Sequence, residues 1–270
     1  MIRHPFARLL LPLVVASLTT GLAAAATLPG INIRWDNCFA DGGGMNKTFA
    51  CATNSGFEQA IMSVQLDTGM QNVSGMEIRI SLKAAAATLP AWWDFKNVGA
   101  CRQTSLAFVT SPVVTPGACV DWGGGGQVGG IGAYNVGALG PASAVLQLVE
   151  AVPQTELQDL LPVTEYLVGA MQFNHTKTVG AGSCAGCDVP VCILFTSLNV
   201  TQPLGVGDRL ITQAANGVGS QFVHWQNGQL VNLINHCNGT FDCNTQFDCV
   251  LSNPTQARGN TWGAVKALYR

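Results

Sequence analysis

Ten cysteines limit the folds open to this 270-residue chain more than any other feature of its sequence. An even count in an exported chain is typical of a disulfide-stapled fold, here with five bridges. Each bridge is expected to stabilise the fold by about 2–4 kcal/mol, mainly by restricting the unfolded chain. The disulfide candidates are Cys38, Cys51, Cys101, Cys119, Cys184, Cys187, Cys192, Cys237, Cys243 and Cys249.

The spacing of the cysteines along the chain reduces the number of disulfide pairings to consider. Cys38 with Cys51, and Cys101 with Cys119, would each close a short loop that contains Gly or Pro, and these are the pairs we expect. The other six cysteines fall into two triplets, and a triplet cannot pair internally without leaving one cysteine over. At least one bridge should therefore join the first triplet to the second.

Cys184 and Cys187 form a CxxC motif, which marks a redox pair when it stands at a helix N-terminus in a thioredoxin-like fold. No βαβ pattern precedes this motif, and Asp188 stands where a covalent haem site needs His. We therefore favour structural disulfides and predict no metal and no cofactor. The alternatives are a thiol or metal role for the first triplet, or a zinc site at His236 with the second triplet.

The first 26 residues have the pattern of a secretory signal peptide. Arg3 and Arg8 precede the apolar residues 9–22, and four alanines at 23–26 suit cleavage. No later segment is long and apolar enough to span a membrane. We expect a secreted or cell-surface protein with a β-sandwich domain at residues 27–220. Residues 221–270 form a cysteine-rich C-terminal extension that belongs to the same domain.

Charged residues make up 10% of the chain, against about 25% in an average globular protein. Hydrophobic residues make up 48%, which excludes a charge-driven disordered chain and a coiled coil. The formal net charge is −2, and the 13 Lys and Arg residues are scattered singly. Without a basic patch that could neutralise phosphates, nucleic acid is not an expected partner.

Residues 76–83 (MEIRISLK) alternate between apolar and polar side chains, as a half-buried antiparallel strand does. Similar short runs recur between Gly, Pro, Asn and Asp clusters; they cover residues 60–66, 105–109, 144–149, 166–173, 191–200 and 221–225. This pattern predicts an all-β fold, a disulfide-stapled antiparallel β-sandwich that is jelly-roll-like or Ig-like. Little helix is expected: two possible turns at residues 155–161 and a short C-terminal helix at 261–269.

Residues 124–129 match GxGxxG, the fingerprint of a dinucleotide-binding loop. No buried parallel strand leads into the match and no helical pattern follows it. A glycine-rich loop or a set of β-turns explains the segment better.

Trp92, Trp93 and Asp94 follow Pro90 and are the candidate ligand-binding residues. In an extended segment, neighbouring side chains point to opposite faces. One indole would then be exposed beside Asp94, where it could stack on a sugar or anchor a protein partner. The alternative is that both rings close one end of the sandwich core.

Catalytic motifs such as GxSxG and HExxH do not occur in the sequence. A glycosidase pair among Glu150, Glu156, Asp159 and Glu165 is conceivable, although solvated acidic loops are the usual explanation of such residues. A catalytic triad could use His175, His224 or His236, but nothing singles out a serine. Calcium ligands among Asp36, Asp41, Asp94 and Asp121 are a weaker possibility, because the spacing of a calcium loop is absent.

Several stretches together resemble a group of uncharacterised secreted proteins of environmental bacteria. They are residues 35–38 (WDNC) with 46–51 (NKTFAC), 89–93 (LPAWW) with 101–102 (CR), 177–192, and 261–270 (TWGAVKALYR). The resemblance covers most of the mature chain and implies a bacterial source, but neither a reaction nor a ligand. The last ten residues are similar to endings of other exported proteins. They form either a sorting or docking tag or a capping helix that buries Trp262, Val265 and Leu268.

The absence of catalytic motifs and the stapled β scaffold favour a secreted, non-enzymatic structural or binding module. Its expected partner is a glycan or a surface protein. A secreted hydrolase that acts on polysaccharide or peptide is the alternative.

Overall fold

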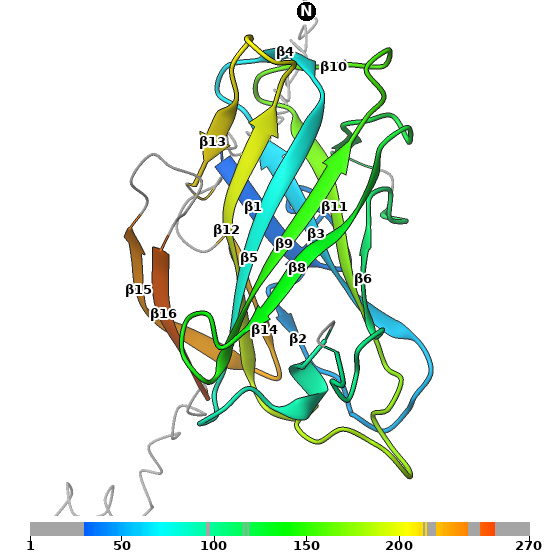
Figure 1. The fold of residues 1–270 in the computed structure, drawn as a ribbon, viewed down its shortest axis with the longest axis vertical. Helices are drawn as coiled ribbons and strands as arrows, with labels where there is room; N and C mark the ends of the chain where they lie inside the picture. Colours follow the sequence, from blue (N-terminus) through cyan, green and yellow to red (C-terminus); the bar gives the residue numbers. More distant parts are fainter. Residues whose placement is uncertain are drawn as a thin grey trace, which may run out of the picture.

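The computed structural model describes residues 30–95, 98–115, 117, 119–212, 214, 220–236 and 244–251. It confirms the predicted all-β fold (Figure 1). The strands are β1 (Gly30–Trp35), β2 (Asn46–Lys47), β3 (Phe57–Gln65), β4 (Met70–Val73), β5 (Gly75–Ala84), β6 (Leu106–Val109), β7 (Val120–Asp121), β8 (Val128–Val136), β9 (Ser143–Ala151), β10 (Gln158–Leu160), β11 (Glu165–Asn174), β12 (Val191–Thr201), β13 (Arg209–Ile211), β14 (Phe222–Trp225), β15 (Gly228–His236) and β16 (Asn244–Leu251).

Two sheets form the sandwich. One has the strand order β1-β3-β11-β6, with β7 also paired to β11; the other has the order β2-β14-β12-β5-β9-β8, with β13 also paired to β12. All the long pairings are antiparallel. Two further ribbons, β4 with β10 and β15 with β16, lie outside these sheets.

Strand β5 shows why the chain folds this way. Its alternating pattern places Met76, Ile78, Ile80 and Leu82 in the core, where each is almost fully buried. The polar residues between them point to the outer face of the seven-stranded sheet. Side chains from both sheets share one core cluster, so the sheets pack face to face as a β-sandwich.

The seven predicted strand segments all overlap observed strands. Strand β1 was not predicted, although residues 31–35 (INIRW) alternate between apolar and polar side chains; the structure buries all six residues of the strand. Residues 124–129 were predicted as a glycine-rich loop or a set of β-turns; residues 122–125 do form turns, but Val128 and Gly129 already belong to β8. Gly129 suits this strand because a Cβ there would lie 2.3 Å from the Val149 carbonyl oxygen.

The helical expectation for residues 155–161 is wrong, because this segment is a turn followed by β10. The only helix in the described residues is a 3₁₀ turn, η1 (Ala91–Trp93), so no described helix is long enough to span a membrane. The signal peptide and the C-terminal helix were predicted for segments outside the described residues.

The disulfides differ from the expected local pairs. The observed bridges are Cys38–Cys119, Cys51–Cys187, Cys101–Cys184 and Cys192–Cys249. Pairing Cys38 with Cys51 and Cys101 with Cys119 was wrong, because the antiparallel strands bring loops that are distant in sequence to the same place. The predicted bridge between the two triplets is confirmed by Cys192–Cys249, while Cys237 and Cys243 lie outside the described residues.

The CxxC motif is therefore no redox pair, because Cys184 and Cys187 each bond to a different distant cysteine. The thiol and metal alternative for the first triplet is wrong for the same reason: its three sulfurs are all consumed in disulfides. Several disulfides suit an oxidising, extracellular compartment.

The C-terminal extension starts inside the sandwich, since β14 pairs with β12. The β15–β16 hairpin then lies against the outer face of the seven-stranded sheet (Figure 1). Phe247 and Cys249 of the hairpin pack on Cys192 and Leu194 of β12. Lys83 of β5 donates to the Phe247 carbonyl oxygen and pairs with Asp248, which anchors the hairpin.

Candidate functional site

The structure buries both predicted ligand-binding tryptophans. Trp92 and Trp93 are fully buried and pack edge to face, with ring centroids 5.1 Å apart. The expectation of an exposed indole is wrong because residues 91–93 form a 3₁₀ turn rather than an extended segment, so both rings turn into the core. Asp94 beside them is partly exposed, and a binding role for it stays a prediction.

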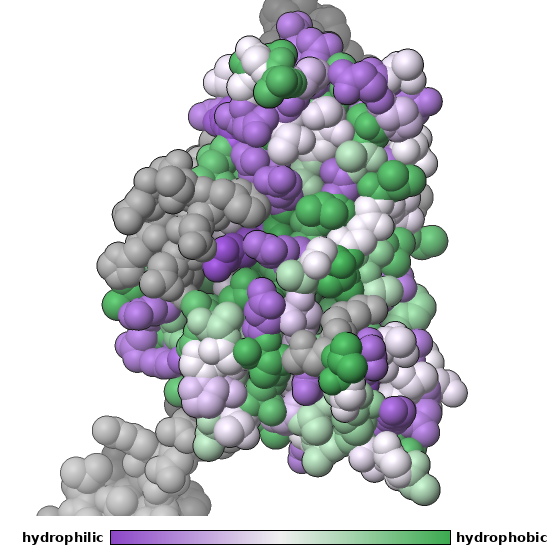
Figure 2. Space-filling model, viewed as in Figure 1, coloured by the Kyte–Doolittle hydropathy of each residue, from purple (hydrophilic) through white to green (hydrophobic). Residues whose placement is uncertain are grey.

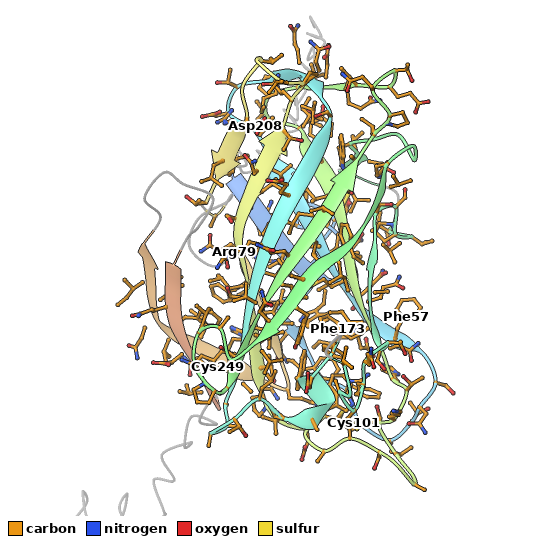
Figure 3. All side chains as sticks on the ribbon, viewed as in Figure 1. Phe57, Arg79, Cys101, Phe173, Asp208 and Cys249 are labelled. Carbon is orange, nitrogen blue, oxygen red and sulfur yellow. A yellow bond between two sulfur atoms is a disulfide. The ribbon has the colours of Figure 1, made fainter. Side chains whose placement is uncertain are left out.

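These rings belong to what we call the stapled end of the sandwich. This end comprises the aromatic cluster around Trp92, the loops that carry the disulfides Cys51–Cys187 and Cys101–Cys184, and Arg102. The cluster consists of Trp35, Trp92, Trp93, Phe95, Phe173 and Trp225. Figure 3 labels Cys101 at this end and Asp208 near the opposite end.

Arg102 is fully buried at the stapled end. Its guanidinium stacks 3.6 Å from the centroid of the Trp92 ring and donates to the carbonyl oxygens of Trp92, Asn174 and Thr176. Burial lowers the pKa of Arg102 to about 9. Since each of its three nitrogens donates to a backbone carbonyl oxygen, the guanidinium joins three segments of the chain.

The candidate hydrolytic residues are also occupied. Glu165 is buried and accepts hydrogen bonds from the backbone N–H groups of Phe39 and Ala40. His175 places Nδ1 2.7 Å from the Ser55 carbonyl oxygen and Nε2 3.3 Å from Glu58, so both ring nitrogens face protein acceptors. Glu165 also accepts a hydrogen bond from the buried Ser63 hydroxyl, so groups of the protein surround its carboxylate.

The remaining candidates are scattered. Glu150 is buried against Trp122, whose indole nitrogen donates to it at 2.6 Å, and burial raises the pKa of Glu150 well above its ordinary value. His224 stacks on Phe222, and burial lowers its pKa. Glu156 and Asp159 are exposed, and the side chain of His236 lies outside what the structure describes.

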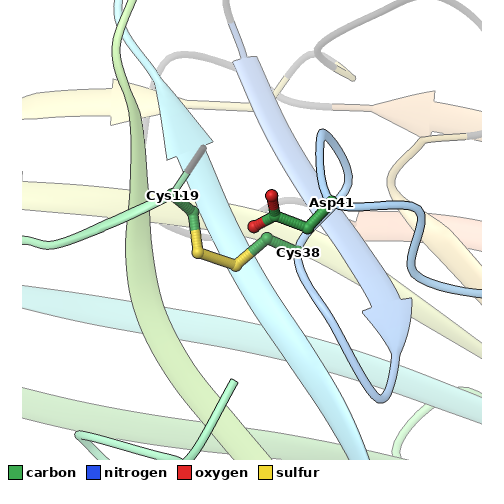
Figure 4. Close-up of side chains that lie close together, drawn as sticks. All are labelled: Cys38, Asp41 and Cys119. Carbon is green, nitrogen blue, oxygen red and sulfur yellow. A yellow bond between two sulfur atoms is a disulfide. The ribbon is translucent and has the colours of Figure 1, made fainter. Parts of the chain in front are cut away.

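Asp41 lies beside the Cys38–Cys119 disulfide, and the three side chains are close enough to suggest a metal site (Figure 4). The two sulfurs are bonded to each other and therefore offer no thiolate. A single carboxylate remains, which is too little to hold an ion at this place.

The end opposite the staples is exposed and apolar. We call it the open rim and define it as residues 66–73, 157–164 and 201–209. These loops follow the ends of β3, β9 and β12, and the β4–β10 ribbon holds the first two together. Figure 2 shows apolar patches among hydrophilic residues at this end.

Four large apolar side chains of the open rim face solvent. Their exposed fractions are 62% for Leu161, 65% for Val163, 106% for Leu204 and 57% for Val206. Exposed apolar residues are common singly, but a group of them on neighbouring loops marks an interaction surface.

Two of the four, Leu161 and Val206, line a hollow of about 550 Å³. Met70 and Leu160 line its floor, and Leu161 and Val206 line it from two different loops. A second hollow of about 500 Å³ adjoins it along residues 202–208. The open rim therefore combines a concave surface with exposed apolar side chains, as a docking site for a protein does.

The open rim is acidic. Asp67, Asp159 and Asp208 against Arg209 leave it with a net charge of −2. Arg209 is bound to Asp67, and this hydrogen bond lowers the pKa of Asp67. Asp159 accepts from the Asn72 N–H and Asp208 from the Gln202 N–H, so both carboxylates also order the loops.

Another hollow, of about 460 Å³, lies beside the β15–β16 hairpin. Its charged lining groups are already paired, because Lys83 and Asn232 both donate to Asp248. The pairing explains how the hairpin is held and leaves the open rim as the stronger candidate.

Sequence reasoning missed the open rim. The available signal was a set of large apolar residues in loops rich in Pro and Gly, as in residues 161–163 (LPV) and 203–207 (PLGVG). Such residues lie outside any predicted strand, so the sequence does not assign their side chains to the core.

Comparison with known proteins adds little. No family model and no curated protein matches the sequence. One solved structure that resembles the chain is the second type II cohesin module from the cellulosomal adaptor ScaA scaffoldin of Acetivibrio cellulolyticus. The TM-score is 0.31 and the identity 12%, over 69% of this chain and 90% of that chain. A likeness this weak carries no argument about function.

Proposed function

We propose that this protein is an extracellular, non-enzymatic binding module whose open rim docks a protein partner. The observation that carries the proposal is the group of four exposed apolar side chains on the open rim, two of which, Leu161 and Val206, line its larger hollow. Burial of such side chains by a partner would remove apolar surface from water, which stabilises a complex by roughly 25 cal/mol per Å² before ordering costs.

The rest of the molecule suits this role. Hydrogen bonds of Asp159, Asp208 and Arg209 to backbone groups order the loops of the open rim, so these loops lose less conformational entropy when a partner binds. The hydrolase alternative finds no support in His175 or Glu165, because both are engaged in hydrogen bonds that hold loops in place.

The test compares binding of the mature chain to purified surface proteins and to polysaccharides of its source cell. Leu161→Asp combined with Val206→Asp is expected to weaken binding of the protein partner about tenfold or more. Val98→Asp is the matched control, because Val98 is 97% exposed but lies between Trp93 and Cys101. Equal binding by both variants would remove the open rim from the proposal. Turnover of a polysaccharide or peptide would overturn the non-enzymatic assignment.

A further inference from the structure

We infer that the open rim accepts a basic amphipathic segment, and that residues 252–270 of a second copy of this chain supply it. The inference rests on the proposed function, since it names the partner of the same surface. Its consequence is head-to-tail association of the protein outside the cell.

Charge is the first argument. The open rim has a net charge of −2, so an anionic partner or an anionic lipid surface would be repelled. Residues 252–270 contain Arg258, Lys266 and Arg270 and no acidic residue, which gives their side chains a net charge of +3. The two segments of the same chain are therefore complementary in charge.

Apolar content is the second argument. The same C-terminal residues include Trp262, Val265 and Leu268 at spacings of three, which would lie on one side of a helical turn. A short amphipathic segment that lays its apolar side into a hydrophobic groove is a common mode of peptide recognition. The hollow between Leu161 and Val206 offers such a groove.

The length that the chain can span after Leu251 bears on whether the C-terminal segment comes from the same copy or from a second copy. Leu251 pairs with Gly228, and Gly228 lies against Val191 at the start of β12. The open rim begins at the other end of β12, 10 residues further on, or about 33 Å at roughly 3.3 Å per residue. The 11 residues from Leu251 to Trp262 reach about 36–40 Å only when fully extended. Trp262 of the same copy could therefore approach the hollow only on a taut linker, where its effective concentration is low, whereas the segment of a second copy has no such constraint.

An open rim that receives the segment of the next copy makes a heterologous contact, which repeats along a chain instead of closing into a dimer. The test is sedimentation of the full mature protein over a range of concentrations. Wild type is expected to form species beyond the dimer that grow with concentration and shrink in high salt. A monomer at every soluble concentration would overturn the inference.

Complementation sharpens the test. Leu161→Asp/Val206→Asp destroys the open rim and keeps the C-terminal segment, whereas Lys266→Glu/Arg270→Glu does the reverse. Each variant alone should be monomeric, and an equal mixture should form one-to-one dimers that do not grow. A mixture that stays monomeric would contradict the head-to-tail contact. Circular dichroism checks that both variants are folded.

Variants that remove single carboxylate charges should weaken association less than the variants above. Asp159→Asn and Asp208→Asn keep an oxygen acceptor for the backbone N–H groups that these residues bind, and together they should weaken association about tenfold. Asp188→Asn, at an exposed carboxylate outside the open rim, should change nothing. If Asp188→Asn weakened association as much as Asp159→Asn and Asp208→Asn do, the weakening would depend on net charge alone, and the argument from charge complementarity would be wrong. If wild type is monomeric yet binds a surface protein through the open rim, the proposed function stands and only this inference fails.

Discussion

The two ends of the sandwich are built for opposite purposes. The stapled end buries its largest rings, saturates a guanidinium with carbonyl oxygens and ties its loops with two disulfides. The open rim contains no cysteine and leaves four large apolar side chains in water. If the proposed function is right, stability and recognition are separated along the long axis of the sandwich.

Such a separation has a physical reason. Apolar groups that face solvent cost stability, and a small number of strained or exposed positions is tolerated only where the surrounding fold is over-determined. Variants at the stapled end should therefore lower stability and spare binding, and variants at the open rim should do the reverse.

Removal of one staple should have the largest effect. Replacing Cys51 and Cys187 with Ser opens a loop of sequence separation 136, and the free energy of unfolding should fall by about 4 kcal/mol. Thermal unfolding measures the loss, and partner binding at a temperature where the variant is folded should match wild type. Weakened binding by the folded variant would show that the two ends are coupled.

Loss of the buried guanidinium should come next. Arg102→Met leaves three backbone carbonyl oxygens without their donor, and the expected loss of stability is about 3 kcal/mol. Arg102→Lys should rescue little, because an ammonium cannot reach three carbonyl oxygens and stack on Trp92 at once. Denaturant unfolding of both variants measures this, and a fully stable Lys variant would contradict the assignment.

The sequence predicted the fold well because β5 and its neighbours alternate between apolar and polar residues, a local pattern that indicates a half-buried strand. It failed where tertiary contacts decide. Strand β1 alternates between apolar and polar residues, yet Asn32 and Arg34 are buried together with its apolar residues, which the pattern does not predict. Disulfide pairing failed similarly, since loop length along the chain says nothing about which strand ends meet.

The candidate site was harder to predict than the fold. Trp92 and Trp93 attracted attention as large adjacent rings, but a 3₁₀ turn of three residues buries both. Leu161 precedes Pro162 and Leu204 lies between Pro203 and Gly205, in loops where sequence patterns do not predict whether a side chain is buried. A binding surface made of loops becomes visible only when the topology gathers them at one end of the sandwich.

A pH-dependent effect should follow at the buried carboxyl. Burial raises the pKa of Glu150 in the folded state, so the stability that its neutral form provides is present below its unfolded pKa and is lost as the pH rises toward the folded value. Glu150→Gln keeps an acceptor for Trp122 and should gain stability on the order of 1 kcal/mol at neutral pH. The gain should vanish below about pH 4.

Unfolding of wild type and Glu150→Gln between pH 4 and pH 8 measures this difference. Glu156→Gln serves as the control, because Glu156 is exposed on the loop that follows β9, and its difference from wild type should stay flat. A Glu150→Gln difference that is independent of pH would mean that the folded protein holds this carboxyl ionised.

The smallest effect is expected at Val163 and bears most directly on the comparison. Val163 has a φ of 63°, a left-handed conformation that β-branched residues rarely adopt. Asn tolerates this conformation, so Val163→Asn should stabilise the fold by about 0.5 kcal/mol. The same change removes an exposed apolar side chain of the open rim and should weaken partner binding. Val113→Asn, at an exposed valine outside the open rim, should do neither. A Val163→Asn protein that is more stable and binds as tightly as wild type would show that the open rim needs no apolar side chain at this position.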